Sequence, residues 1–237
     1  MSTGASPRFL FFDAVGTLLR PVPDVVTVYH QVGHAHGSRL TTAAIRDRFS
    51  QLYRVHFARD SANRETLRTS EQHERRRWQA LVQELFAEVT ASDQLFSALW
   101  EHFSQPRHWE LYPDVPSAIE WLNDRGFAWG IASNFDRRLE SIVADQPALA
   151  AAQLVITSAS AGWSKPAAEF YLQAAQAAAH RLGIAEPQLC MIGDNPTLDV
   201  AAARARGWQA IWLERDQPAA LQEGRIQTLH DLQFLLP

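Results

Sequence analysis

The sequence predicts an α/β fold in which a doubly wound parallel sheet carries an inserted, purely helical domain. Two observations support this prediction. Short, nearly continuous apolar runs recur along the chain, as expected of strands that are buried on both faces. After the first of these runs, residues 21–106 show only helical patterns.

Five apolar runs are the candidate strands, and each one ends in a polar residue. They cover residues 8–13, 127–133, 152–158, 188–194 and 208–214. Helical segments lie between the last four runs, at residues 136–145, 167–183 and 196–207. The last segment begins with Pro196 and ends with Gly207, which is the usual asymmetry of helix ends. Strands that alternate with helices favour a parallel sheet covered on both faces.

The long helical stretch after the first strand predicts a second domain. Its four helical patterns cover residues 24–37, 41–60, 70–89 and 92–105. Three prolines, at positions 106, 113 and 116, mark the return of the chain to the sheet. We therefore expect residues 1–20 and 107–237 to form the sheet domain and residues 21–106 to form a helical cap.

Composition excludes several classes of protein. The formal net charge is −4, which indicates neither nucleic acid nor an acidic membrane surface as a partner. The longest basic run, Arg75–Arg77, is interpreted as a solvated helix face. A single cysteine, Cys190, excludes a disulfide framework and a thiolate zinc site. The first residues lack the apolar core of a signal peptide and no run approaches ~18 apolar residues, so we expect a cytoplasmic protein.

Carboxylates follow two of the predicted strands. Ligands of an open parallel sheet bind beyond the carboxyl ends of its strands. Asp13 ends the first run and is a potential nucleophile, and Gly16 and Thr17 allow a tight turn that directs backbone N–H groups toward an anion. Asp194 ends the fourth run and is a hard oxygen ligand suited to Mg²⁺, with Asp199 five residues later as a second acidic group.

Anion-binding groups lie at two further places. Ser133 and Asn134 follow the second strand and offer a hydroxyl and an amide to an oxyanion. The chain has 22 Lys and Arg residues, and Lys165 in the turn-like stretch GWSKP is its only lysine. A compact ammonium there can neutralise both Asp13 and a substrate phosphate.

These motifs, in this order, resemble the haloacid dehalogenase (HAD) superfamily. The pattern is Asp-x-x-Gly-Thr, then Ser-Asn, then Lys-Pro, then Gly-Asp-x4-Asp. The likeness implies a Rossmann-like core with the helical cap of the first subclass of that superfamily. A closer likeness, carried by SNFDRRLE (133–140) and TSASAGWSKP (157–166), is to the haloacid dehalogenase-like hydrolase domain-containing protein 3 group.

The resemblance also implies roles for individual residues. Asp13 would be the nucleophile, with Lys165 and Ser133 completing the catalytic set. The phosphate site would comprise Ala14, Val15, Thr17, Ser133, Asn134 and Lys165. Mg²⁺ would be held by Asp13, Asp194 and the backbone carbonyl of Val15, supported by Asp199 and Asn195. The expected partner is a small phosphorylated molecule bound by a monomer or homodimer.

Val15 departs from the family pattern. The phosphatases of the superfamily carry a second Asp at this position, which protonates the leaving alcohol and then activates water. Losing such a group costs typically ~10²–10⁴-fold in rate. Three functions remain open: an Mg²⁺-dependent phosphohydrolase with weakened acid–base catalysis, a 2-haloacid dehalogenase, whose halide leaves without a proton, and a weak or inactive protein that binds Mg²⁺ and an anion.

Overall fold

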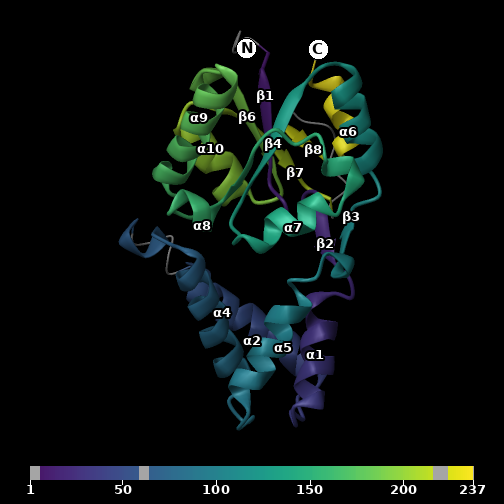
Figure 1. Cartoon of the computed structure of the whole chain (residues 1–237), viewed down its shortest axis with the longest axis vertical. Helices are drawn as coiled ribbons and strands as arrows, with labels where there is room; N and C mark the ends of the chain where they lie inside the picture. Colours follow the sequence, from purple (N-terminus) through teal and green to yellow (C-terminus); the bar gives the residue numbers. More distant parts are fainter. Residues whose placement is uncertain (1–5, 59–63, 216–223, 237) are drawn as a thin grey trace.

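The computed structural model describes residues 6–58, 64–215 and 224–236, and its centre is a parallel six-stranded sheet (Figure 1). In spatial order the strands are β5 (Val155–Thr157), β4 (Ala128–Ser133), β1 (Phe9–Phe12), β6 (Leu189–Gly193), β7 (Gln209–Leu213) and β8 (Arg225–Ile226). All neighbouring pairs are parallel. The five predicted strands and the doubly wound α/β fold are confirmed.

Helices cover both faces of this sheet (Figure 1). One face packs against α6 (Val115–Asp124), α7 (Arg138–Ala144) and the C-terminal 3-10 turn Leu229–Phe234. The other face packs against α9 (Ala168–Leu182) and α10 (Ala202–Ala205). Strand β1 lies between them and is fully buried, because Leu10 and Phe12 join the first cluster while Phe9 and Phe11 join the second.

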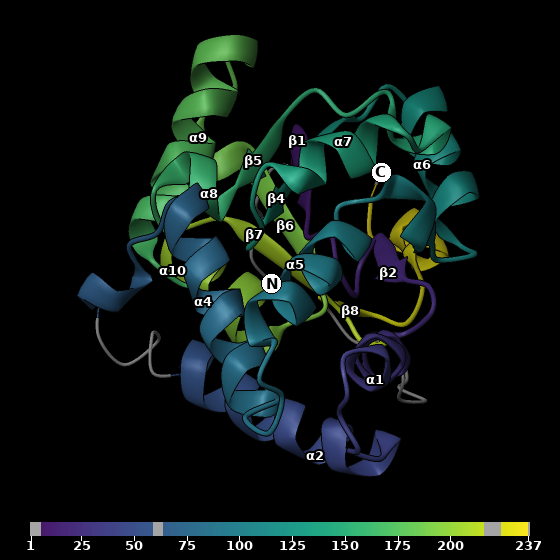
Figure 2. The same cartoon turned by 60° about the horizontal axis from the view of Figure 1, so that its bottom comes forward.

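Four longer helices of the inserted segment form a separate apolar cluster. They are α1 (Val25–Ala35), α2 (Thr42–Tyr53), α4 (Glu71–Leu85) and α5 (Ser92–His102). The side chains of Asp24, Thr41 and Ser70 cap the first three by accepting hydrogen bonds from free N–H groups of the first turn. These helices lie beyond the carboxyl ends of the sheet strands (Figures 1 and 2).

Several short elements were not predicted from the sequence. A two-stranded antiparallel ribbon, β2 (Leu19–Pro21) with β3 (Trp109–Leu111), lies where the chain leaves the sheet and returns to it. Such three-residue strands carry too little periodicity to be recognised. The segment that begins at Pro196 is a π-helical turn, Pro196–Ala201, before α10, and Tyr53 is likewise followed by a π-helical turn, Arg54–Ala58. The predicted continuation to residue 60 lies outside the described residues.

The remaining elements are short. The helix α8 (Ser158–Ala161) follows β5, and 3-10 turns cover Arg64–Leu67, Pro106–His108, Pro147–Leu149 and Glu186–Gln188. Cys190 is buried in the sheet, as expected of a small hydrophobic residue. Among the described residues, no helix is long and apolar enough to cross a membrane.

Candidate active site

The carboxyl ends of the central strands and the inner face of the cap enclose a cavity of about 600 Å³. Asp13 follows β1, Ser133 ends β4, and Asp194 follows β6. These three strands are neighbours in the sheet, which is why residues far apart in the sequence meet here. Lys165, from the loop after α8, lines the same cavity.

The Lys165 ammonium is buried, with 3% of the residue exposed, and it joins the two halves of the site. Its Nζ donates to Asp13 Oδ1 at 2.6 Å, to Asp199 Oδ1 at 2.6 Å and to the carbonyl of Ala132 at 3.0 Å. Burial lowers the pKa of Lys165, but the carboxylates of Asp13 and Asp199 outweigh it and raise the pKa above its ordinary value. The lysine is therefore a fixed cation, because all three of its protons have acceptors.

Asp199 holds this lysine in place from the opposite side. Its Oδ2 accepts the backbone N–H of Asn195 at 3.0 Å while Oδ1 accepts from Lys165. A Cβ on Gly193 would lie 2.3 Å from Asp199 Oδ2, so the carboxylate can approach the strand only because that residue is glycine. The Asn195 side-chain oxygen accepts the N–H groups of Thr197 and Leu198, and thereby caps the helical turn that carries Asp199.

Three carboxylates form an acidic cluster with the geometry of a metal site. Asp13, Asp194 and Asp199 each place one oxygen within 4.8 Å of the others. Both oxygens of Asp199 are engaged, so Asp13 and Asp194 are the better candidate ligands. Burial and the charges of Asp13 and Asp199 raise the pKa of Asp194 to about 7. One ammonium among three carboxylates leaves an excess of negative charge, and oxygen ligands of this kind suit Mg²⁺.

The turn after Asp13 fits around this cluster. Gly16 has a φ of +91°, and a Cβ there would lie 2.4 Å from Asp194 Oδ2. Ala14 and Thr17 are fully buried and are not among the described residues that line the cavity, so their side chains do not face an anion as expected. The Thr17 hydroxyl is buried without a partner among the described residues, while its carbonyl accepts from Arg215 at 2.7 Å.

Asn134 lines the cavity, but its side chain has another task. Its Oδ1 accepts the backbone N–H of Lys165 at 2.7 Å, and its Nδ2 donates to the Lys165 carbonyl at 3.0 Å. Asn134 was expected to offer this amide to an oxyanion. In the structure it fixes the main chain of the lysine instead, so of the Ser-Asn pair Ser133 is the residue placed to meet an anion directly.

Val15 is 36% exposed and lines the cavity beside Asp13. The side chain therefore occupies the region where the second Asp of the family pattern would project. It offers no proton and no acceptor, whereas its backbone carbonyl is unaffected by the change of side chain.

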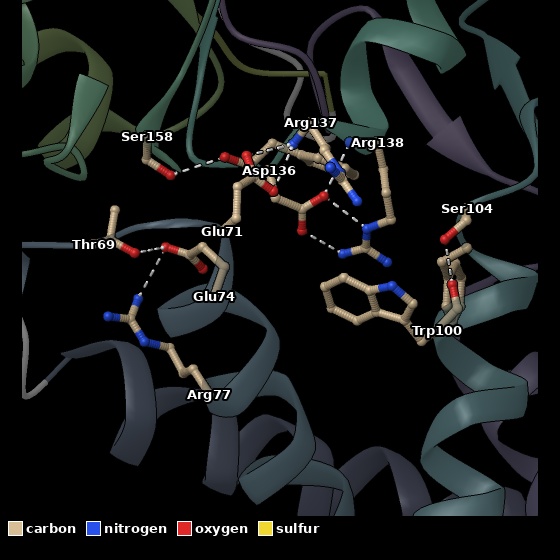
Figure 3. Close-up of polar contacts among 12 residues, drawn as sticks. Thr69, Glu71, Glu74, Arg77, Trp100, Ser104, Asp136, Arg137, Arg138 and Ser158 are labelled. Carbon is tan, nitrogen blue, oxygen red and sulfur yellow. Dashed lines mark hydrogen bonds and ion pairs between the residues drawn. The ribbon is translucent and has the colours of Figure 1, made fainter. Parts of the chain in front are cut away.

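Polar contacts tie the cap to the sheet domain at the rim of the cavity (Figure 3). The Glu71 carboxylate of α4 accepts the backbone N–H of Arg137 at 3.0 Å. Arg138 donates twice to Asp136, at 2.8 and 2.7 Å, and its guanidinium carbon lies 3.5 Å from the centre of the Trp100 ring of α5. The cap and the sheet domain are thus linked through side chains as well as through the two connecting strands.

A second tie reaches the lysine loop. The N–H of Thr69 donates to the Gly162 carbonyl at 3.0 Å, and the N–H of Ser164 donates to the Leu67 carbonyl at 2.8 Å. Because Ser164 directly precedes Lys165, the inserted segment supports the loop that positions the lysine.

Sequence reasoning missed most of the cap residues that line the cavity. They include Tyr29, Phe49, Tyr53, Glu74, Arg77, Trp78 and Trp100. Arg77 is a correction, because its side chain is largely buried beside Glu74 rather than solvated with Arg75. The available signal was the pair Phe49 and Tyr53, which are aromatic residues one helical turn apart in an otherwise polar segment.

Comparison with known proteins identifies the family. The model of the haloacid dehalogenase-like hydrolase family matches residues 7–207, so the chain belongs to this family of hydrolases. The chain is 28% identical, over 89% of its length and 83% of the relative's, to haloacid dehalogenase-like hydrolase domain-containing protein 3 of Bos taurus. The likeness to this group is therefore confirmed. Phosphoserine phosphatase of Thermus thermophilus is 29% identical over 55% of this chain and 53% of its own.

Solved structures share the whole fold at low sequence identity. The putative HAD-hydrolase YfnB from Bacillus subtilis, bound to magnesium, has a TM-score of 0.71 at 17% identity and covers 98% of this chain and 99% of its own. The defluorinating L-2-haloacid dehalogenase Rha0230 has a TM-score of 0.75 at 18% identity, over 99% of this chain and 97% of its own. These similarities support the fold with its helical cap.

Proposed function

We propose that this hydrolase is an Mg²⁺-dependent phosphohydrolase that acts on a small phosphorylated molecule through an aspartyl-phosphate at Asp13. The observation that carries the proposal is the Asp194 carboxylate beside Asp13. In a metal-free dehalogenase this second negative charge would oppose an anionic substrate, whereas a divalent cation between the two would attract one. The relative named phosphoserine phosphatase adds support for phosphate chemistry.

The donor set fits Mg²⁺. Asp13, Asp194 and the Val15 carbonyl would hold the ion, and the oxygen ligands match its preference. When bound, the ion would supply positive charge to the phosphoryl oxygens. Asp199 would remain the partner of Lys165, since both of its oxygens are already hydrogen-bonded.

Two displacements at phosphorus complete the proposed reaction. Lys165 holds Asp13 Oδ1, so Oδ2 attacks the phosphorus, and the P–O bond to the leaving group breaks with its electron pair on the departing oxygen. Ser133 and Lys165 meet the negative charge on the phosphoryl oxygens. Water then attacks the phosphorus of the aspartyl-phosphate, which releases inorganic phosphate and restores the Asp13 carboxylate.

Val15 sets the proposed limit of this reaction. With no acid at this position, the leaving group departs as an anion, so acyl and aryl phosphates are better substrates than alkyl phosphates. Hydrolysis of the aspartyl-phosphate, which also lacks its base, would be the slow step.

The test is turnover of a phosphate ester panel with and without Mg²⁺, run beside Asp13→Asn. We expect Mg²⁺-dependent release of phosphate that Asp13→Asn abolishes and that Asp124→Asn, a change at an exposed position on α6, leaves intact. Activity that survives Asp13→Asn removes the mechanism. Chloride release from 2-chloropropionate would favour a dehalogenase, and Mg²⁺ binding without any turnover would favour a binding protein.

A further inference from the structure

Three aromatic rings of the cap form one wall of the cavity. Phe49 and Tyr53 of α2 stack with their centroids 5.9 Å apart, and Trp78 of α4 lies 6.4 Å from Phe49 and 6.3 Å from Tyr53. All three line the cavity that contains Asp13 and Lys165. Tyr53 is 43% exposed, and the other two are partly exposed. We call these three residues the aromatic wall.

The packing of the cap does not account for this exposure. The buried cluster of the cap consists of other residues, among them Tyr29, Leu81 and Phe86, which are almost fully buried. Aromatic area left open inside a functional cavity is typical of a site for a ligand with an apolar body. The nearby charged groups of the cap are paired with each other, because Glu74 accepts from Thr69 at 2.6 Å and lies 3.6 Å from Arg77.

The wall lies within electrostatic reach of the phosphoryl site. Burial and the carboxylates of Asp13 and Asp194 raise the pKa of the Tyr53 phenol, which therefore stays neutral and adds no charge against a bound anion. A displacement at phosphorus requires the leaving group to lie opposite the nucleophile. The nucleophile comes from the sheet, so the leaving group projects toward the cap.

Val15 independently restricts the same leaving group. A phenolate spreads its negative charge over the ring and leaves readily without a proton, whereas an alkoxide does not. The missing acid and the aromatic wall thus favour one chemical class, since a phenolic group satisfies both.

We propose that the cavity selects aryl phosphate monoesters, with the aromatic body of the substrate stacked against Phe49, Tyr53 and Trp78 and its phosphoryl group at Asp13. This proposal rests on the phosphohydrolase function proposed above, whose active site it uses. It goes further by assigning the apolar half of the substrate to named residues of the cap.

Binding of non-hydrolysable phosphonates tests this proposal without requiring turnover. Methylphosphonate and phenylphosphonate share the phosphoryl group and differ in the body. In the presence of Mg²⁺, calorimetry should show that phenylphosphonate binds tighter by at least about tenfold, the usual gain from burying a ring. Tyr53→Ala should reduce this advantage by about two- to tenfold, whereas Tyr53→Phe, which keeps the ring, should preserve it.

Two controls accompany this comparison. Val55→Ala shortens an exposed residue in the next turn that is not among the described residues lining the cavity, and should leave the advantage unchanged. Methylphosphonate affinity should be the same in all variants, which shows that each is folded with its phosphoryl site intact.

The outcomes separate this inference from the proposed function. Equal affinities for the two phosphonates, no binding of either one, or an advantage that Tyr53→Ala leaves intact would overturn the inference, even if acetyl phosphate is hydrolysed. A ring-dependent advantage supports it, and if phenyl phosphate is nevertheless not hydrolysed, only the proposed function fails.

Discussion

At the residue scale, Val15 is the side chain that most restricts the chemistry. It lies in the cavity beside Asp13 with an aliphatic surface where an acid would serve. Restoring the acid with Val15→Asp should raise turnover of alkyl phosphates by up to ~10²-fold and that of aryl phosphates much less, because only alkoxides need the proton. Steady-state kinetics on matched alkyl and aryl esters measure the difference.

The control for this change is Val15→Asn. Asparagine has the same shape as aspartate but cannot exchange a proton, so it should give no gain on alkyl phosphates. An equal gain from both variants would mean that polarity at this position, rather than acid–base catalysis, limits the wild-type enzyme.

Asp194 gives the site a pH-dependent cost in the metal-free protein. Its pKa is about 7 in the folded chain and 3.8 in a model compound, so the folded state binds the extra proton between these values. Stability therefore falls as pH rises from about 4 to 7 and then stays level. In EDTA, Asp194→Asn should raise the Tm at pH 8 and have little effect near pH 4.

Mg²⁺ should reverse this ranking. The ion offsets the repulsion between the carboxylates of Asp13 and Asp194, so it should raise the Tm of the wild type at pH 8 more than that of Asp194→Asn. Thermal melts with EDTA or Mg²⁺ at several pH values are the measurement. A lower Tm for Asp194→Asn at pH 8 in EDTA would contradict the electrostatic explanation.

At the element scale, the turn after β1 brings the carboxylates together. Gly16 adopts a φ of +91° and leaves room for Asp194. Gly16→Ala should lose Mg²⁺ binding and activity, because the methyl group would displace the Asp194 carboxylate, and should also destabilise the fold by about 1 kcal/mol or more. Calorimetric titration with Mg²⁺ and urea unfolding report the two effects.

Gly37 is the matched control for this turn. Its φ is +92°, and nothing lies within 4 Å of the position of a Cβ. Gly37→Ala should therefore cost a similar amount of stability and leave Mg²⁺ binding unchanged. If both variants bind Mg²⁺ normally, the contact with Asp194 does not matter for the metal site.

The elements that sequence could predict are those with a strong local signal. The five buried strands are continuous apolar runs, and α9 ends at Gly183, which adopts the left-handed conformation. The β2–β3 ribbon and β8 were missed because two or three residues carry no measurable periodicity. The π-helical turns at Pro196 and Arg54 were missed because their sequence pattern resembles that of an α-helix.

The site was predictable to the same physical limit. Asp13, Ser133, Lys165 and Asp194 follow strand ends or a turn, and the topology brings them together. The hydrogen bonds of Asn134 to Lys165 and the aromatic wall depend on tertiary packing, which no local pattern records. This is why the roles of side chains were harder to predict than their positions.

At the scale of the whole molecule, Arg138 links the two domains through a buried ion pair. Its guanidinium binds Asp136 at two points and covers Trp100 of the cap. Arg138→Ala would leave the Asp136 carboxylate buried without its cation, so we expect a loss of about 3–5 kcal/mol in the free energy of unfolding. Arg138→Lys should recover only part of it, because an ammonium cannot make the two-point contact.

A double-mutant cycle isolates this interaction. In an Asp136→Asn background no charge is stranded, so Arg138→Ala should cost clearly less than it does in the wild type. Urea unfolding of the four proteins gives the coupling free energy. Additive effects would show that Arg138 stabilises the molecule through Trp100 or through packing rather than through Asp136.

The burial of Lys165 has a practical consequence for chemical labelling. The chain contains no other lysine, and this one lies inside the site with all of its protons engaged. Amine-directed reagents should therefore attach a dye or a surface linker only to the α-amino group of the native protein. Modification of Lys165, read by mass spectrometry, would then count the molecules whose active site has opened.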